Sequence, residues 1–283
     1  MDMPLDFISC AFPCLSNINL LKRGGQKFVY TSVHQDFGKV ALKLISADCA
    51  DARILREIQS GHERCFVNVP KIFLDGRIKI HDFDFVYIIE QFIEGSDLRV
   101  LLQKGVLFSF NDILIMLESI LDTLVDLENA HIVHRDIKLD NIVRDVTGRF
   151  WLIDFGIARD LDMVSLTATT DNLGPHTPGY ASPEQLLNHK RLIDSRSDLF
   201  SLGVVTYELL TGFNPFIKNA NGLMDILNRT LALSIEPLQI KEDPNGDFSA
   251  FVQTLLQKSP LWRPPTAKVA HDWFMQIKTE LLK

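Results

Sequence analysis

The stretch His134-Arg135-Asp136-Ile137-Lys138-Leu139-Asp140-Asn141, followed by Asp154-Phe155-Gly156, is the part of the chain that decides its fold. In a fixed order it offers a carboxylate, a cation and two oxygen-bearing side chains: Asp136, Lys138, Asn141 and Asp154. An isolated Asp or Asn in a loop usually forms a turn. An ordered set is hard to reach by chance. Phosphoryl transfer needs a carboxylate to align a hydroxyl, a cation over the moving charge, and oxygen ligands for Mg²⁺, so the set indicates that chemistry.

The composition is that of a globular protein. The 283 residues are 46% hydrophobic and 23% charged, and the formal net charge is -7. An acidic chain of this kind is a poor match to nucleic acid or to an anionic membrane surface. No stretch reaches the ~20 apolar residues of a membrane span, and the acidic start at residues 1–6 differs from a secretory signal. We therefore expect a cytoplasmic protein without nucleic-acid or membrane partners.

The cysteines do not indicate a disulfide scaffold. Cys10, Cys14, Cys49 and Cys65 are too few for one in a chain this long. Cys10 and Cys14, with His62 and Cys65, offer a nominal zinc site, but the first spacing is loose, and reduced structural thiols are the preferred interpretation.

The first ninety residues are patterned as sheet with one helix. Residues 28–33 and 39–45 are rich in β-branched and aromatic residues, and the turn-like residues 34–38 between them predict a hairpin. Residues 50–60 mix good helix formers with apolar positions, and residues 85–89 return to a strand pattern.

Beyond a predicted linker at Gly95-Ser96-Asp97 the period becomes helical. A core helix is predicted around residues 113–127, capped by Asn111 or Asp112, and residues 199–210 suit a fully buried helix. Asp247 is predicted to open a further helix. Thr266 is predicted to cap a last one that turns Val269, Trp273, Phe274 and Ile277 inward. A small β-rich lobe is therefore expected to precede a larger helical lobe.

The opening stretch resembles the catalytic loop and magnesium-binding triplet of eukaryotic-type serine/threonine protein kinases, and the resemblance runs from about Leu20 to the end. It implies an α+β, two-lobed protein-kinase-like fold with an N-lobe at residues 1–90, a hinge at 91–95 and a C-lobe at 96–283. It also implies ATP and Mg²⁺ as cofactors. The catalytic residues would be Asp136 and Lys138, and the metal ligands Asn141 and Asp154.

Further residues of the N-lobe are similar to the nucleotide-binding part of the family. Val40-Ala41-Leu42-Lys43 resembles the strand whose lysine holds the α- and β-phosphates, and Glu57 the helix residue that pairs with this lysine. Glu63 is an alternative partner. Glu57 is preferred because Val69-Pro70-Lys71 then lies where the family's next strand begins.

Residues 87–95 are similar to the hinge of the family, where backbone groups of Gln91 and Ile93 would meet the adenine edge. In that register Glu90 is the gatekeeper residue beside the adenine pocket. A carboxylate is unusual there, and it has to be solvated, paired or protonated.

The glycine-rich phosphate loop departs from the family pattern. Registering Val29 as its valine places Lys22, Gly24 and Lys27 at the three glycine positions. Only the central glycine is kept, although Gly24-Gly25 still allows a close approach of the backbone to phosphate. Lys22 and Lys27 either add charge against phosphate or are solvated lysines at strand ends. The nucleotide-binding residues implied here are Gly24, Gly25, Val29 and Ala41.

Residues 154–184 resemble an activation segment that ends in Ser182-Pro183-Glu184. The resemblance implies that Glu184 pairs with Arg263, that Asp198 anchors the backbone of the catalytic loop, and that Thr177 contacts this loop. Arg135 and Arg159 are expected to bind one phosphate on the segment. The expected acceptors, by self-phosphorylation, are Thr167, Thr169 and Thr170.

The implied function is ATP-dependent transfer of the γ-phosphoryl group to serine or threonine hydroxyls of a protein substrate. Lys138 is the serine/threonine feature. Two alternatives stay open: a pseudokinase scaffold, which the altered glycine loop favours, and a small-molecule phosphotransferase, which Glu184 with Arg263 disfavours. Asp140 hints at a basic residue in the substrate, or it bonds its own backbone.

Overall fold

The computed structural model describes residues 4–24, 27–47, 65–154 and 177–283. These residues form two compact units. The first holds the described residues up to Phe66 together with Pro70–Ile93. The second holds Val67–Val69 and the described residues from Glu94 onward. Each unit is described by itself.

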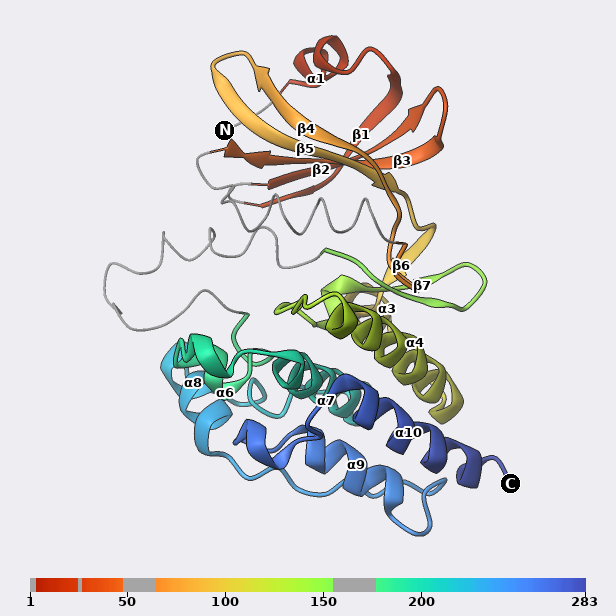
Figure 1. Ribbon diagram of the computed structural model, residues 1–283, viewed down its shortest axis with the longest axis vertical. Helices are drawn as coiled ribbons and strands as arrows, with labels where there is room; N and C mark the ends of the chain where they lie inside the picture. The colour runs from red at the N-terminus through yellow and green to blue at the C-terminus, as the bar shows by residue number, and fades with distance from the viewer. Residues whose placement is uncertain (1–3, 25–26, 48–64, 155–176) are drawn as a thin grey trace. The chain divides into compact units, whose positions relative to one another are not determined.

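The first unit is a five-stranded sheet with a short helix (Figure 1). Its neighbouring strands are antiparallel, in the order β1-β2-β3-β5-β4. The predicted strands at residues 28–33, 39–45 and 85–89 are confirmed within β2, β3 and β5. The bounds are α1 (Leu5–Ala11), β1 (Leu15–Arg23), β2 (Lys27–His34), β3 (Gly38–Ser46), β4 (Ile72–Ile80) and β5 (Phe83–Gln91). The helix predicted at residues 50–60 lies outside the described residues.

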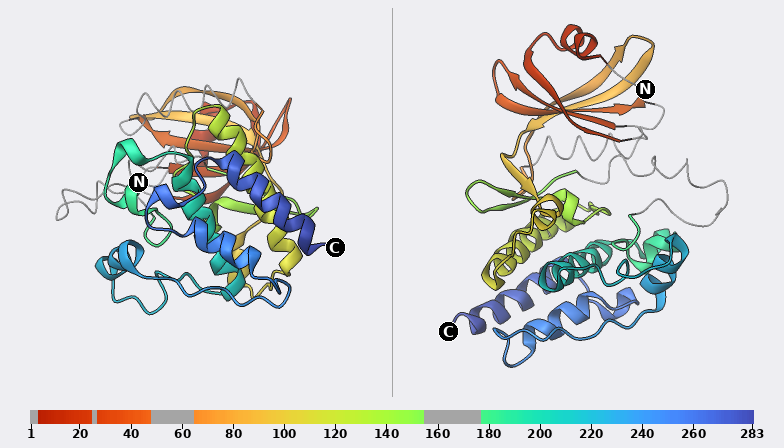
Figure 2. Two further views of the ribbon diagram at one scale, coloured as in Figure 1. Left: turned by 60° about the horizontal axis from the view of Figure 1, so that its bottom comes forward. Right: turned by 180° about the vertical axis from the view of Figure 1, so that it is seen from behind.

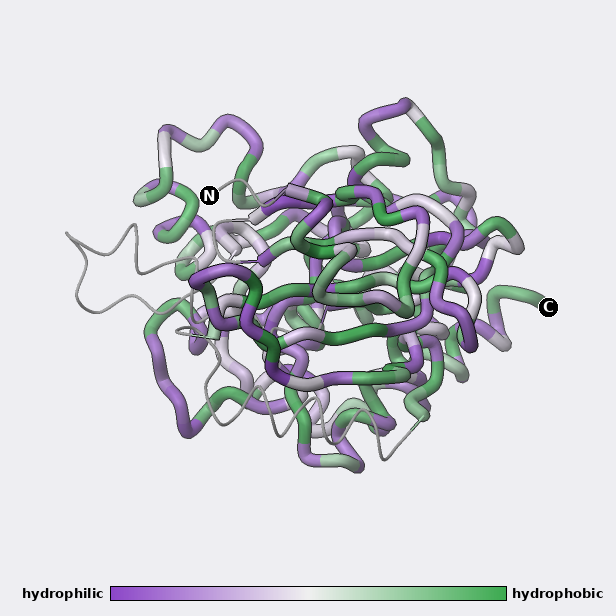
Figure 3. Tube along the Cα trace, turned by 90° about the horizontal axis from the view of Figure 1, so that it is seen from above, coloured by the Kyte–Doolittle hydropathy of each residue, from purple (hydrophilic) through white to green (hydrophobic). Residues whose placement is uncertain are grey.

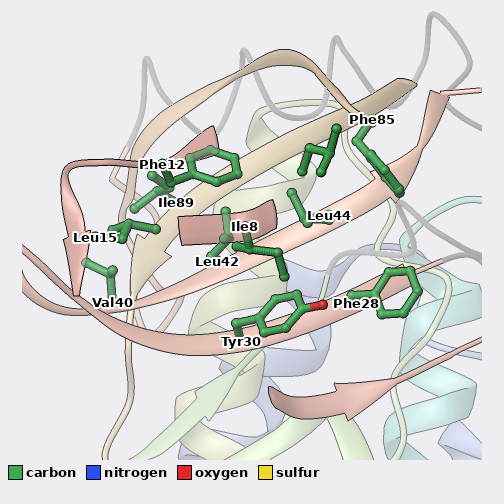
Figure 4. Packing of buried hydrophobic residues seen from close by; sticks show 11 residues of the cluster. Ile8, Phe12, Leu15, Phe28, Tyr30, Val40, Leu42, Leu44, Phe85 and Ile89 are labelled. Atoms are coloured by element: carbon green, nitrogen blue, oxygen red, sulfur yellow. The ribbon is translucent and has the colours of Figure 1, made fainter. Parts of the chain in front are cut away.

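The two faces of this sheet have different neighbours, because successive side chains of a strand point to opposite sides. One face packs into a core that includes Leu42 and Leu44 of β3, both fully buried, and Tyr30 of β2. Ile8 of α1 packs into the same core, as Figure 4 shows. Each such side chain contributes about 1.5–3 kcal/mol of burial energy. Lys43 lies on the opposite face. Figure 3 shows the hydrophobic stretches that run along the strands and hydrophilic colour at several turns.

The second unit is mainly helical and also carries a small sheet, in the order β6-β7-β8. Its helices α4, α7, α9 and α10 pack on one another (Figure 2). The strands are β6 (Gly95–Asp97), β7 (Ile142–Asp145) and β8 (Phe150–Leu152). The helices are α3 (Leu98–Gln103), α4 (Phe110–Asn129), η2 (Leu139–Asn141), α6 (Pro183–Leu186), η5 (Lys190–Leu192), α7 (Ser195–Thr211), α8 (Leu223–Ala232), α9 (Asp247–Leu255), η6 (Pro260–Trp262) and α10 (Ala267–Leu281).

The predicted core helices are present, and two details of their ends and faces were wrong. The N-cap of α4 is Ser109, whose hydroxyl accepts from the Asp112 N–H at 3.1 Å, while the Asp112 carboxylate accepts from the Ser109 N–H at 3.0 Å. Asp112 therefore completes a capping box and Asn111 is no cap. Thr266 caps α10 as predicted, but Val269 is exposed and only Phe274 and Ile277 of the predicted set are buried.

The predicted linker at residues 95–97 is strand β6. Gly95 pairs with Asp145 of β7, and a Cβ at Gly95 would lie 2.2 Å from the carbonyl oxygen of Arg144. The glycine therefore marks a close approach of two backbones rather than a flexible connection. Among the helices that the structure describes, none is both long enough and apolar enough for a membrane span.

Candidate active site

The loop at residues 134–141 is held by a buried carboxylate at the start of α7. Asp198 accepts hydrogen bonds from the His134 N–H at 2.8 Å and from the Arg135 N–H at 2.7 Å. Arg135 has a φ of 67°, a left-handed conformation that a side chain rarely adopts and that these bonds help to maintain. The predicted anchoring role of Asp198 is confirmed. Burial raises the pKa of Asp198 to about 7, although both backbone bonds lower it.

Three side chains that the sequence singled out meet around the carboxylate of Asp136. Its Oδ2 accepts from Asn141 Nδ2 at 2.9 Å and lies 3.1 Å from Lys138 Nζ. Its Oδ1 accepts from the Thr177 hydroxyl at 3.2 Å, which itself accepts from Lys138 Nζ at 3.5 Å. The expected contact of Thr177 with the catalytic loop is confirmed. Asp136 is thus a buried carboxylate held in one orientation beside a cation, as alignment of a hydroxyl requires.

Asn141 and Asp154 are brought together by the pairing of β7 with β8, because Asn141 directly precedes β7 and Asp154 closely follows β8. The Ile153 N–H donates to the Asn141 carbonyl at 2.9 Å, and Asp154 follows with a left-handed φ of 57°. Because Asn141 Nδ2 bonds to Asp136, the amide oxygen is the ligand atom that this side chain offers. One carboxylate and one amide oxygen suit Mg²⁺, which takes few protein ligands and completes its shell with phosphate and water. The residues present therefore fit the metal. Phe155 and Gly156 lie outside the described residues.

In the first unit, Lys43 is paired with Glu90. Lys43 Nζ lies 2.5 Å from Glu90 Oε1, and the two side chains are only 7% and 10% exposed. Of the three states left open for a gatekeeper carboxylate, the structure shows the paired one. The partner predicted for Lys43, Glu57, and its alternative Glu63 both lie outside the part of the chain that the structure describes.

The remaining nucleotide-binding candidates are placed as follows. Val29 lies opposite Lys43 and Ala41 opposite Glu90 in the antiparallel ladders, so both share the face of Lys43. The Gly24 N–H donates to the Lys27 carbonyl at 2.8 Å, and a Cβ there would make only an ordinary 3.6 Å contact. Local geometry thus does not require a glycine at position 24.

Gly25 is not among the described residues. At the predicted hinge, the Gln91 N–H donates to the Lys71 carbonyl at 2.8 Å, so this N–H is already engaged within the sheet. Ile93 is the last described residue of the first unit.

A second buried ion pair joins distant parts of the second unit. Arg263 donates from Nη1 to Glu184 Oε1 at 2.6 Å and from Nη2 to Glu184 Oε2 at 3.0 Å, as predicted. Burial raises the pKa of Glu184, but the hydrogen bonds and charge of Arg263 outweigh it, and the pKa is lower than usual.

One charged network was missed. Arg99 of α3 donates to Glu208 of α7 at 2.8 Å and to the Tyr180 hydroxyl, which donates to Glu208. Burial, reinforced by Glu208, raises the pKa of Tyr180. Arg99 Nε also lies 3.6 Å from Asp140 Oδ2, so Asp140, suspected of binding substrate, has an internal partner. No sequence signal links these residues, because they meet only through tertiary packing.

Comparison with known proteins agrees with this geometry. A family model described as protein kinase domain matches residues 16–275. The "Probable serine/threonine-protein kinase SCO3848" of Streptomyces coelicolor is 36% identical over 207 residues, which are 71% of this chain and 30% of that protein. The serine/threonine-protein kinase PknB of Mycobacterium leprae is 30% identical over 262 residues, 88% of this chain and 40% of that protein. The chain thus spans less than half the length of these curated relatives.

Among solved structures, the PknI kinase domain of Mycobacterium tuberculosis superposes with a TM-score of 0.65, covering 93% of this chain and 96% of that one. At 19% identity this likeness shows the fold. The fold predicted from the opening stretch is confirmed. With a family model over most of its length, the same ordered set of residues around Asp136, and these relatives, the chain belongs to the serine/threonine protein kinase family.

Proposed function

We propose that this chain transfers the γ-phosphoryl group of ATP to serine or threonine hydroxyls of a protein substrate. The observation that carries the proposal is the cluster of Asp136, Lys138, Asn141 and Thr177, because it holds a carboxylate and a cation at fixed positions beside a hydroxyl. The names of the curated relatives support serine and threonine as acceptors. A cytoplasmic location is part of the proposal.

In this mechanism Asp136 aligns the acceptor hydroxyl and takes its proton. Lys138 faces Asp136 Oδ2 and would neutralise the oxygens of the moving phosphoryl group. Asn141 and Asp154 would hold Mg²⁺, which when bound neutralises charge on the phosphates. Lys43 would hold the α- and β-phosphates. Most of the rate enhancement then comes from positioning and charge stabilisation, without a covalent intermediate.

The test is phosphoryl transfer from labelled ATP with Mg²⁺ and a generic protein substrate, followed by identification of the labelled amino acid. Asp136→Asn should fold and lower the rate by about 10²–10⁴-fold, because it keeps the shape and removes the base. The matched control is Asp84→Asn, the same change at an exposed position of β5, and it should retain full activity. Label on small molecules alone, or no transfer by the wild type, would instead favour the phosphotransferase or the pseudokinase.

We further propose that the activation segment is a phosphorylation switch. The Nε of Arg135 is buried and has no hydrogen-bond partner. The charge of Arg135 acts on Asp198, but this carboxylate accepts from the backbone N–H groups of His134 and Arg135. A phosphate on Thr167, Thr169 or Thr170 would provide a bidentate, charge-assisted partner for this arginine. These threonines, and Arg159, lie outside the described residues.

A further inference from the structure

The Lys43–Glu90 pair is built into the centre of a sheet. β3 and β5 are neighbours with strands on both sides, and their ladder runs from Val40↔Gln91 to Ser46↔Phe85 without a bulge. Ala41 is opposite Glu90 and Lys43 opposite Ile88, so Lys43 and Glu90 are diagonal neighbours on one face. Long side chains reach each other across such a diagonal.

The environment of this pair favours a fixed geometry. Both side chains are almost completely buried, and their neighbours on the same face, Ala41, Ile45 and Ile88, are at most 6% exposed. An ammonium in such surroundings stays charged only beside a counter-charge, and Glu90 Oε1 supplies one at 2.5 Å. The backbone ladder, rather than a separate element, sets where this counter-charge lies.

We propose that Glu90 is a positioning residue for Lys43. The carboxylate keeps the ammonium charged and holds it on the nucleotide-binding face of the sheet, so that it meets the phosphates of ATP without depending on Glu57 alone. This inference rests on the proposed function, because it assigns to Lys43 the phosphate contact made there. It predicts that Glu90 acts on the phosphate part of the nucleotide and leaves the adenosine part unaffected.

The test compares ADP with adenosine, which lacks the phosphates that Lys43 would contact. Calorimetric titrations of wild type, Glu90→Gln and Glu90→Asp are run with each ligand, together with ATP kinetics. Glu90→Gln should weaken ADP binding and raise the KM for ATP by on the order of ten-fold, the size of a lost charge-assisted hydrogen bond. Adenosine affinity should stay at the wild-type value. Glu90→Asp, which retains the charge, should recover part of the loss.

A matched control variant separates the effect of Glu90 from a general change in charge. Asp84→Asn removes the same charge from the same strand at an exposed site and should change neither affinity. Unchanged or tighter ADP binding by Glu90→Gln would overturn the inference. So would an equal loss for adenosine and ADP, because Glu90 would then shape the base pocket. It would also be overturned if Glu57→Gln, titrated in the same way, weakened ADP binding while Glu90→Gln did not. If the wild type binds no ADP and transfers no phosphate, the proposed function itself fails.

Discussion

Replacing Arg263 by methionine should destabilise the second unit severely. All five N–H groups of this guanidinium are used: two on Glu184, and three on the carbonyls of Gln257, Arg196 and Lys258 at 2.8–3.1 Å. The Arg263 and Glu184 side chains are 0% and 2% exposed. Methionine fills part of the volume but provides none of these donors. Of the side chains that donate to the Glu184 carboxylate, only the Ser197 hydroxyl, at 2.7 Å, would remain.

The magnitude follows from what is left behind. Removing one partner of a buried ion pair costs about 3–5 kcal/mol, because the remaining charge is buried without compensation. The orphaned carbonyls add to this, since an unmet buried acceptor costs about 1–3 kcal/mol. Because some of these groups can relax or bind water, we expect a total loss of about 4 kcal/mol. That is a large share of the 5–15 kcal/mol that stabilises a typical protein.

The assay is urea unfolding followed by tryptophan fluorescence, because all three tryptophans, Trp151, Trp262 and Trp273, belong to the second unit. Arg191→Met is the matched control, the same substitution at an exposed site, and should lie within about 0.5 kcal/mol of wild type. A loss below about 1 kcal/mol for Arg263→Met, or a loss equal to that of Arg191→Met, would refute the reasoning that the pair bears on stability.

Three further outcomes are expected. Glu90→Thr should improve the affinity of bulky hydrophobic inhibitors that use the space behind the gatekeeper, because the buried carboxylate resists desolvation; equal inhibition constants would show that the hinge register is wrong. Burial raises the pKa of Asp198 to about 7 from an ordinary 3.8, so between these pH values Asp198 is protonated in the folded state and ionised in the unfolded state. The free energy of unfolding should therefore fall as pH rises from about 4 to about 7, by up to ~1.4 kcal/mol per pH unit. That component of the slope should be missing in Asp198→Asn, and an identical slope would exclude Asp198 as its source. A variant with alanine at Thr167, Thr169 and Thr170 should have a lower initial rate than wild type pre-incubated with ATP. Equal rates, with no phosphate on the wild-type segment, would contradict the proposed phosphorylation switch.

Local patterns predicted the elements of this fold well where one physical signal dominates. The core helix predicted around residues 113–127 was visible because its apolar residues recur at three-and-four spacing, and those from Ile113 to Leu127 that follow this spacing are buried. The pairing of Glu184 with Arg263, by contrast, came from the family resemblance, because nothing in the spacing of residues 79 apart brings them together.

The errors have physical causes that are local and specific. Ser109 was passed over as the cap of α4 because Asn111 and Asp112 are also good capping residues, and the pattern Ser-x-x-Asp decides only when the helix start is known. Gly95 was taken for a linker because glycine usually interrupts a strand. The reason for glycine there, the carbonyl of Arg144, belongs to a strand nearly fifty residues further on.

The Lys43–Glu90 pair shows where sequence reasoning stops. A period of two tells which side chains of one strand share a face, but the order of strands in the sheet decides which faces become neighbours. β3 pairs with β5, although β4 comes between them in the chain, and only this register places Glu90 on the diagonal from Lys43. The cost of burying the acid of Glu90 is therefore offset by the lysine. It follows that every substitution at Glu90 also changes the electrostatic environment of Lys43, so inhibitor affinity and nucleotide affinity have to be measured on the same variants.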